Sequence, residues 1–231
     1  MPLVPWQYVR VTILSLCVMA AAPVISGCGA KFSTTLHSDG QGGTVAMVPG
    51  SYNPQVASRW VIYFHGYSEG ADVILTGAYG NTMQELVNHG YVVVAMNNTV
   101  LNCYGNAQCS KDVAGLIENY RSVLNLEPEP YAIATSMGGF TMLNAIAAGV
   151  MHPKAAVGWS MNTNLASAYD DGAGPVIAQD YNISESNSFE LATAGYDPLR
   201  DAGKTFAAVP FELWSSYGDE VVPRAENTDP F

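Results

Sequence analysis

Charged residues are scarce in this sequence of 231 residues, and basic residues are the scarcest of them. Only 13% of the residues are charged, and 9 Lys and Arg stand against 20 Asp and Glu, so the formal net charge is −11. A surface with this excess of negative charge repels phosphate backbones, which argues against nucleic acid as a partner. Because 48% of the residues are hydrophobic, the low charge does not indicate an unfolded chain.

The N-terminal region lacks an apolar run long enough to span a membrane comfortably. The run that follows Arg10 covers residues 11–22 and is broken by Pro23, whereas a spanning helix needs about 20 apolar residues. A basic start, a short apolar stretch and small residues after it are typical of an export signal.

The residues at the end of this signal, Ile25-Ser26-Gly27-Cys28, resemble the lipobox of bacterial lipoproteins. The resemblance implies that residues 1–27 are a cleaved signal peptide and that the thiol of Cys28 is acylated. The protein would then be exported and anchored by lipid to the outer face of the cytoplasmic membrane; a plain secretory peptide is the alternative. Residues 28–43 are polar and rich in Gly, so we expect them to form a tether.

Cysteine is also scarce, with four residues in the chain, of which Cys17 lies in the signal and Cys28 follows it. The other two, Cys103 and Cys109, lie in one short polar segment. Two neighbouring thiols in an exported chain are expected to form a local disulfide. A metal site is less favoured, because no histidine or further cysteine lies at ligand spacing.

Beyond residue 43, short apolar runs alternate with longer amphipathic ones. We expect strands at 60–64, 91–96, 131–135, 155–159 and 211–214, and helices over 71–89, from Ser110 as the cap, and over 137–149. This alternation predicts an α/β fold with a mostly parallel, doubly wound sheet and helices on both faces. Residues 160–205 interrupt the pattern and are expected to form a lid inserted between two strands.

A serine stands where a buried strand turns directly into a helix, in Ala134-Thr135-Ser136-Met137-Gly138-Gly139. This segment resembles the nucleophile elbow of the α/β-hydrolase superfamily, with Ala134 where a Gly is usual. The resemblance covers residues 44–231. It implies an exposed Ser136 hydroxyl that is acylated, and no metal or organic cofactor. A serine that merely caps the helix is the alternative.

Two further motifs extend the resemblance in the expected order along the chain. The turn His65-Gly66-Tyr67 ends an earlier strand, and by resemblance the backbone N–H groups of Tyr67 and Met137 form the oxyanion hole. The segment Gly218-Asp219-Glu220-Val221-Val222-Pro223 resembles the acid turn, in which Asp219 orients the catalytic base. A plain turn-forming role is the alternative for Asp219.

A catalytic histidine is absent from the place where the superfamily has it, after the acid. Phe231 is the twelfth residue after Asp219, and no histidine lies between them. His89 and His152 follow helices that run back from the reactive edge. Three explanations remain open: the chain continues in a longer form that adds a last strand and a histidine, it is an inactive relative, or His65 or His37 is the base.

The resemblance is strongest to secreted esterases and to the prolyl-oligopeptidase-like and dienelactone-hydrolase-like groups. It implies a serine hydrolase that cleaves small carboxylic esters, or amides, through an acyl-enzyme on Ser136. Two alternatives remain: a catalytically inactive, surface-anchored binding protein derived from a hydrolase, and an acyltransferase that passes the acyl group to another acceptor.

Overall fold

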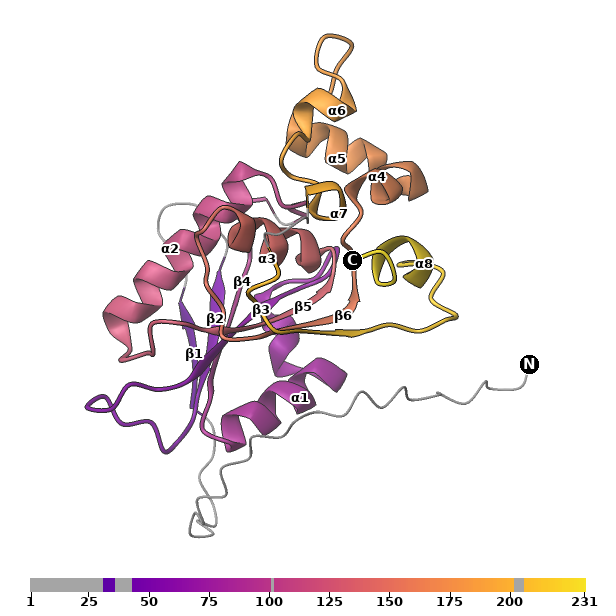
Figure 1. Ribbon diagram of the computed structural model, residues 1–231. Coiled ribbons are helices and arrows are strands. Elements are labelled where there is room, and N and C mark those ends of the chain that lie inside the picture. Colours follow the sequence, from indigo (N-terminus) through magenta and orange to yellow (C-terminus); the bar gives the residue numbers. More distant parts are fainter. Residues whose placement is uncertain (1–30, 36–42, 101, 202–205) are drawn as a thin grey trace.

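One seven-stranded sheet forms the centre of the protein. The computed structural model describes residues 31–35, 43–100, 102–201 and 206–231 (Figure 1). The strands follow one another across the sheet in the order β1-β2-β4-β3-β5-β6-β7. Their bounds are β1 (Lys31–Thr35), β2 (Thr44–Val48), β3 (Trp60–Phe64), β4 (Val92–Met96), β5 (Tyr131–Ser136), β6 (Ala156–Met161) and β7 (Phe211–Trp214). Pairing is antiparallel for β1–β2 and β2–β4 and parallel for the other four pairs.

Helices cover both faces of the sheet, as the sequence predicts (Figure 1). The 3-10 helix η1 (Ala71–Leu75) and α1 (Gly77–Asn88) pack on one face, and α2 (Ala107–Val123) and α3 (Gly138–Ala147) pack on the other. Successive residues of a strand point to opposite faces. Val93 therefore joins the apolar cluster under α1, and Val94 joins the cluster under α2 and α3. Both faces of β4 are buried, which explains why its residues form an unbroken apolar run. The helices on both faces of the sheet confirm the doubly wound α/β fold.

Part of the segment expected to be a tether is a strand. Residues 31–35 form β1, which pairs along its whole length with β2. The tether prediction is wrong for these residues, because the stretch contains the strand-favouring Phe32, Thr34 and Thr35 next to an apolar partner strand. Residues 1–30, with Cys28 and the predicted signal peptide, and His37 lie outside the described residues.

The helix expected to start at Ser110 starts earlier, and the predicted disulfide lies at its start. Asn106 is the N-cap, and its side chain accepts hydrogen bonds from the backbone N–H groups of Gln108 and Cys109. Asn is as good a cap as Ser, so the helix begins after Asn106, which comes before Ser110 in the chain. The disulfide between Cys103 and Cys109 is confirmed, and it joins the preceding loop to the first turn of α2.

A group of short helices lies between β6 and β7, and we call residues 162–201 the helical insertion. Its elements are α4 (Leu165–Ala168), the π-helical turn η2 (Tyr169–Ala173), α5 (Gly174–Tyr181), α6 (Phe189–Ala192) and α7 (Pro198–Asp201). They stack beyond the carboxyl end of the sheet, next to α3 (Figure 1). Leu165, Ile177 and Tyr181 pack with Met137 and Phe140 of the segment after β5. The insertion is therefore a packed layer.

The chain ends its described course with a short helix, α8 (Arg224–Asn227), after β7. Within the described ranges, every helix is too short or too polar to cross a membrane.

Candidate active site

The winding of the sheet changes direction between β3 and β5. From β3 the chain passes through α1 to β4 on one side, and from β4 it passes through α2 to β5 on the other side of β3. In open α/β sheets, the crevice outside the carboxyl ends of the strands at such a point is the usual ligand site. Ser136 is the last residue of β5, and His65 directly follows β3. Both residues therefore lie at the edge of the sheet where such a site forms.

Ser136 has a strained backbone. Its φ is 46°, which is in the left-handed region, and Met137 returns to helical geometry with a φ of −50°. Such a conformation costs a non-glycine residue about 1–3 kcal/mol and persists where the surrounding structure enforces it. The register between β5 and β6 shifts at this point, where Ser160 also has a positive φ of 41°. The change from a positive φ at Ser136 to helical angles at Met137 makes the sharp strand-to-helix turn expected of a nucleophile elbow. Ser136 itself is half-buried.

The two glycines after Met137 are required by close packing. A methyl group on Gly138 would lie 2.4 Å from the carbonyl oxygen of Phe64, and one on Gly139 would lie 2.2 Å from Cγ of Met161. Helix α3 therefore begins in direct contact with the ends of β3 and β6. The small residues that the sequence motif contains are explained by this contact, and they fix the position of Ser136.

The turn after β3 lies beside Ser136. A Cβ placed on Gly66 would be 3.5 Å from Cβ of Ser136. Within the described part of the chain, the hydrogen bonds leave the backbone N–H groups of Tyr67 and Met137 unused. These are the two groups that the sequence predicts as oxyanion donors. The side chain of Tyr67 is half exposed at this edge.

Asp219 lies in the turn after β7, and β7 is separated from β5 by β6. Because the three strands are parallel, Ser136 and Asp219 lie at the same edge of the sheet. Oδ1 of Asp219 accepts hydrogen bonds from Val221 N–H at 3.0 Å and Val222 N–H at 2.9 Å. Among the described residues, Oδ2 has no partner, so one oxygen fixes the carboxylate while the other is available.

Asn227, which the sequence analysis did not identify, connects the acid turn to the helical insertion. It is 1% exposed. Its Oδ1 accepts hydrogen bonds from Thr163 N–H at 2.9 Å and Asn164 N–H at 3.2 Å, and its carbonyl oxygen accepts one from Thr163 Oγ1 at 2.8 Å. No local pattern could reveal this role, because the partners are 63 and 64 residues apart in sequence.

His65 lies at the same edge of the sheet as Ser136, but its side chain is hydrogen-bonded within its own turn. Its ring is 3% exposed, and Nδ1 donates a hydrogen bond to its neighbour's carbonyl oxygen, Gly66 O, at 2.8 Å. Nε2 is buried without a hydrogen-bond partner among the described residues. Burial lowers the pKa of His65 below its usual 6.5, so the ring is neutral at pH 7.

The other two described histidines lie at the opposite edge, as expected. His89 ends α1, and its carbonyl oxygen accepts a hydrogen bond from Arg59, the residue before β3. His152 precedes β6, two residues from Lys154, which bonds to the residue before β5. The described residues therefore bring Ser136 and Asp219 to one edge without a histidine free to join them.

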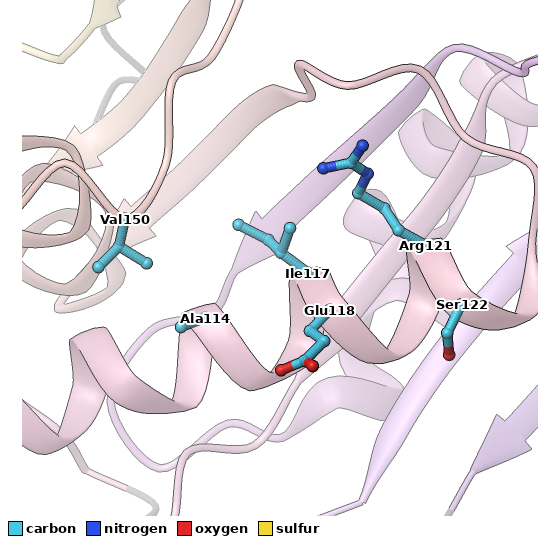
Figure 2. A pocket seen from close by; sticks show the side chains of 6 residues that line it. All are labelled: Ala114, Ile117, Glu118, Arg121, Ser122 and Val150. Atoms are coloured by element: carbon cyan, nitrogen blue, oxygen red, sulfur yellow. The ribbon is translucent and has the colours of Figure 1, made fainter.

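A separate groove of about 500 Å³ lies along α2 (Figure 2). A helix that connects parallel strands runs back towards their amino ends, so the later turns of α2 lie near the opposite edge of the sheet. The lining residues are Ala114, Ile117, Glu118, Arg121, Ser122 and Val150. The groove is not part of the Ser136 site.

Comparison with known proteins gives structural relatives only, since no protein-family model and no curated protein sequence matches the chain. The S-formylglutathione hydrolase from Agrobacterium tumefaciens aligns with 89% of this chain and 82% of its own, at a TM-score of 0.68 and 14% identity. A carboxylesterase from Lactobacillus plantarum aligns with 86% and 75%, at 0.60 and 12%.

The acylaminoacyl peptidase from Pyrococcus horikoshii aligns with 89% of this chain, at a TM-score of 0.66 and 15% identity. The chain spans about a third of that peptidase, 35% of its length. At these identities the likeness concerns the course of the chain. Together with the sheet order and the helices on both faces, it shows that this protein has the α/β-hydrolase fold.

Proposed function

We propose that this protein is a serine hydrolase that cleaves carboxylic esters through an acyl-enzyme on Ser136. The observation that carries the proposal is the positive φ of Ser136 at the junction of β5 and α3, at the edge of the sheet where the winding reverses and where α/β proteins usually bind their ligands. The unused N–H groups of Tyr67 and Met137 beside it support an oxyanion hole.

In the proposed reaction, Ser136 Oγ attacks the ester carbonyl carbon, and its proton passes to a histidine. Tyr67 and Met137 N–H groups stabilise the negative charge on the carbonyl oxygen. The histidine then returns the proton to the leaving alcohol, and water releases the acid from Ser136 by the same steps. Asp219 orients the histidine through Oδ2 and stabilises its charged form.

We propose that this histidine lies outside the described residues, either His37 or one in a longer form of the chain. The alternative is an inactive relative that binds acyl compounds without turnover. That alternative is favoured by the hydrogen bond of His65 to its own turn, which leaves the described site without a base.

A fluorophosphonate probe, which reacts with activated serines, tests the proposal. We expect labelling of the wild-type protein that is lost in Ser136→Ala and kept in Ser51→Ala, a matched change that removes an exposed hydroxyl from the turn after β2. The experiment uses the 231-residue chain and a form extended through the downstream codons. Labelling of the extended form alone places the base in the added segment, whereas labelling of neither form favours the binding protein.

We also propose that the protein is exported and lipid-anchored through Cys28. The Cys103–Cys109 disulfide supports an oxidising compartment. In cells, Cys28→Ala is expected to abolish incorporation of labelled fatty acid and to release the protein from the membrane fraction. Unchanged incorporation would contradict the proposal.

A further inference from the structure

A carboxylate without a role in the proposed reaction lies beside Ser136. Oε2 of Glu69 accepts a hydrogen bond from Gly66 N–H at 2.7 Å, and the backbone N–H of Glu69 donates to Gly66 O at 3.4 Å. Residues 66–69 are therefore closed by one bond of the backbone and one of the side chain. Tyr67, the predicted oxyanion donor of this turn, lies between the two ends of the closed ring.

The turn needs such support because its backbone is strained. Ser68 has a φ of 57°, a conformation that costs a non-glycine residue about 1–3 kcal/mol. On the other side, Ser68 N–H donates to Oδ1 of Asn102 at 2.8 Å. Glu69 and Asn102 thus hold the turn from two directions, and Glu69 is the one that acts on the side of Ser136.

Glu69 and Ser136 both lie close to Gly66. A Cβ on Gly66 would lie 3.0 Å from Oε2 of Glu69 and 3.5 Å from Cβ of Ser136. Gly66 N–H is bound to the carboxylate, and among the described residues the next N–H of the turn, that of Tyr67, has no acceptor. Tyr67 N–H is therefore the donor of this turn that is available to a ligand.

The negative charge of Glu69 does not explain its place. No ion pair of the described residues involves Glu69, and a negative charge near a developing oxyanion opposes the reaction. The carboxylate of Glu69 must therefore contribute through its hydrogen bond to Gly66 N–H. A carboxylate that accepts a hydrogen bond from a backbone N–H makes one of the stronger bonds available to a turn.

We propose that Glu69 is a positioning residue, which binds Gly66 N–H and thereby fixes the turn so that Tyr67 N–H faces a carbonyl bound at Ser136. The proposal rests on the proposed hydrolase function, and it adds to it a residue that the reaction depends on through geometry. Glu69 does not touch the substrate in this assignment.

Two variants separate the hydrogen bond from the charge. Glu69→Gln keeps an oxygen that can accept from Gly66 N–H, whereas Glu69→Ala removes it. With a p-nitrophenyl ester we expect Glu69→Ala to lower kcat by about 10–100-fold with little change in KM, since a whole oxyanion donor is worth about 10²–10³ in kcat. Glu69→Gln is expected to keep kcat within about threefold of the wild type. Equal losses in the two variants, no loss in Glu69→Ala, or a loss confined to KM would overturn the assignment.

Hydrogen exchange of the Gly66 amide, measured by mass spectrometry or NMR, tests the same assignment without turnover. We expect faster exchange at residues 66–68 in Glu69→Ala, partial protection in Glu69→Gln, and no change in Glu85→Ala, which removes an exposed carboxylate from α1. If exchange is unchanged in Glu69→Ala, the positioning role is wrong. If exchange responds but the wild-type protein is not labelled by fluorophosphonate, the hydrolase proposal fails and the assignment of the turn stands.

Discussion

The turn at Ser136 is held by its surroundings, whereas the turn at Asp219 is held by its own hydrogen bonds. Strand β5 has a parallel neighbour on each side, β3 and β6, and α3 begins against the ends of both. Strand β7 pairs with β6 alone among the described residues and is only partly buried. There the carboxylate of Asp219 is fixed by the N–H groups two and three residues later.

This difference separates two ways of placing a functional group. A strained backbone such as that of Ser136 needs a rigid framework, because relaxation would release the stored energy. A self-contained turn needs no such framework and tolerates an edge position. Changes near Ser136 should therefore alter stability, and changes at Asp219 should alter activity with little effect on stability.

The largest expected effect is on activity, from Asp219→Asn. The amide oxygen can still accept the two hydrogen bonds at Oδ1, so we expect the free energy of unfolding to change by less than about 1 kcal/mol. Loss of the charge that supports the imidazolium should lower kcat by about 10⁴ in the form of the protein that reacts with the probe. Glu220→Gln, which changes the exposed neighbour, is the control, and an equal loss there would contradict the role of Asp219.

The second largest effect is on stability, from Gly138→Ala. The added methyl group would lie 2.4 Å from a backbone oxygen of β3, and overpacking of this kind costs about 3 kcal/mol. Unfolding by urea measures the change. Gly115→Ala is a matched control in α2 with no atom within 4 Å, and it should be neutral or raise stability by about 0.5–1 kcal/mol. Similar effects of the two substitutions would argue against the close contact.

Asn227→Ala tests the connection between the acid turn and the helical insertion. It leaves the N–H groups of Thr163 and Asn164 without their acceptor. An unsatisfied buried group costs about 1–3 kcal/mol, so we expect about 2 kcal/mol of destabilisation and faster hydrogen exchange at the start of the insertion. Asn81→Ala, at an exposed position of α1, should change neither. Loss of stability without faster exchange in the insertion would show that Asn227 does not hold the start of the insertion in place.

The smallest expected effect concerns pH and the buried His65. Its pKa is lowered in the folded protein by burial, so the unfolded chain binds a proton below pH 6.5 that the folded protein does not. Stability is then full above about pH 6.5 and falls as the pH drops below it, by at most about 1.4 kcal/mol per pH unit. Unfolding of the wild type and of His65→Asn at several pH values should give a difference that shrinks towards acid pH. A constant difference would indicate that His65 has the same pKa in the folded and unfolded states, which would contradict the effect of burial.

Local sequence determined most of the strands and the turn that carries Ser136. The apolar runs at 60–64 and 91–96 predicted strands, as expected for the buried strands of a parallel sheet, and the small residues after Ser136 are those that a close contact of strand and helix requires. The same local patterns failed at residues 31–35, where polar composition concealed a strand, and at Asn106, where two residues of equal capping strength competed.

The tertiary structure decided which residues that are distant in sequence lie close together. A serine and an aspartate 83 residues apart share one sheet edge because β5, β6 and β7 run parallel. Asn227 reaches Thr163, and Glu69 closes the turn beside Ser136, through contacts that depend on the whole fold. Strand periodicity and turn composition depend on a few neighbouring residues, so they can be recognised in the sequence. Long-range contacts of this kind form only when the sheet and the helices pack together.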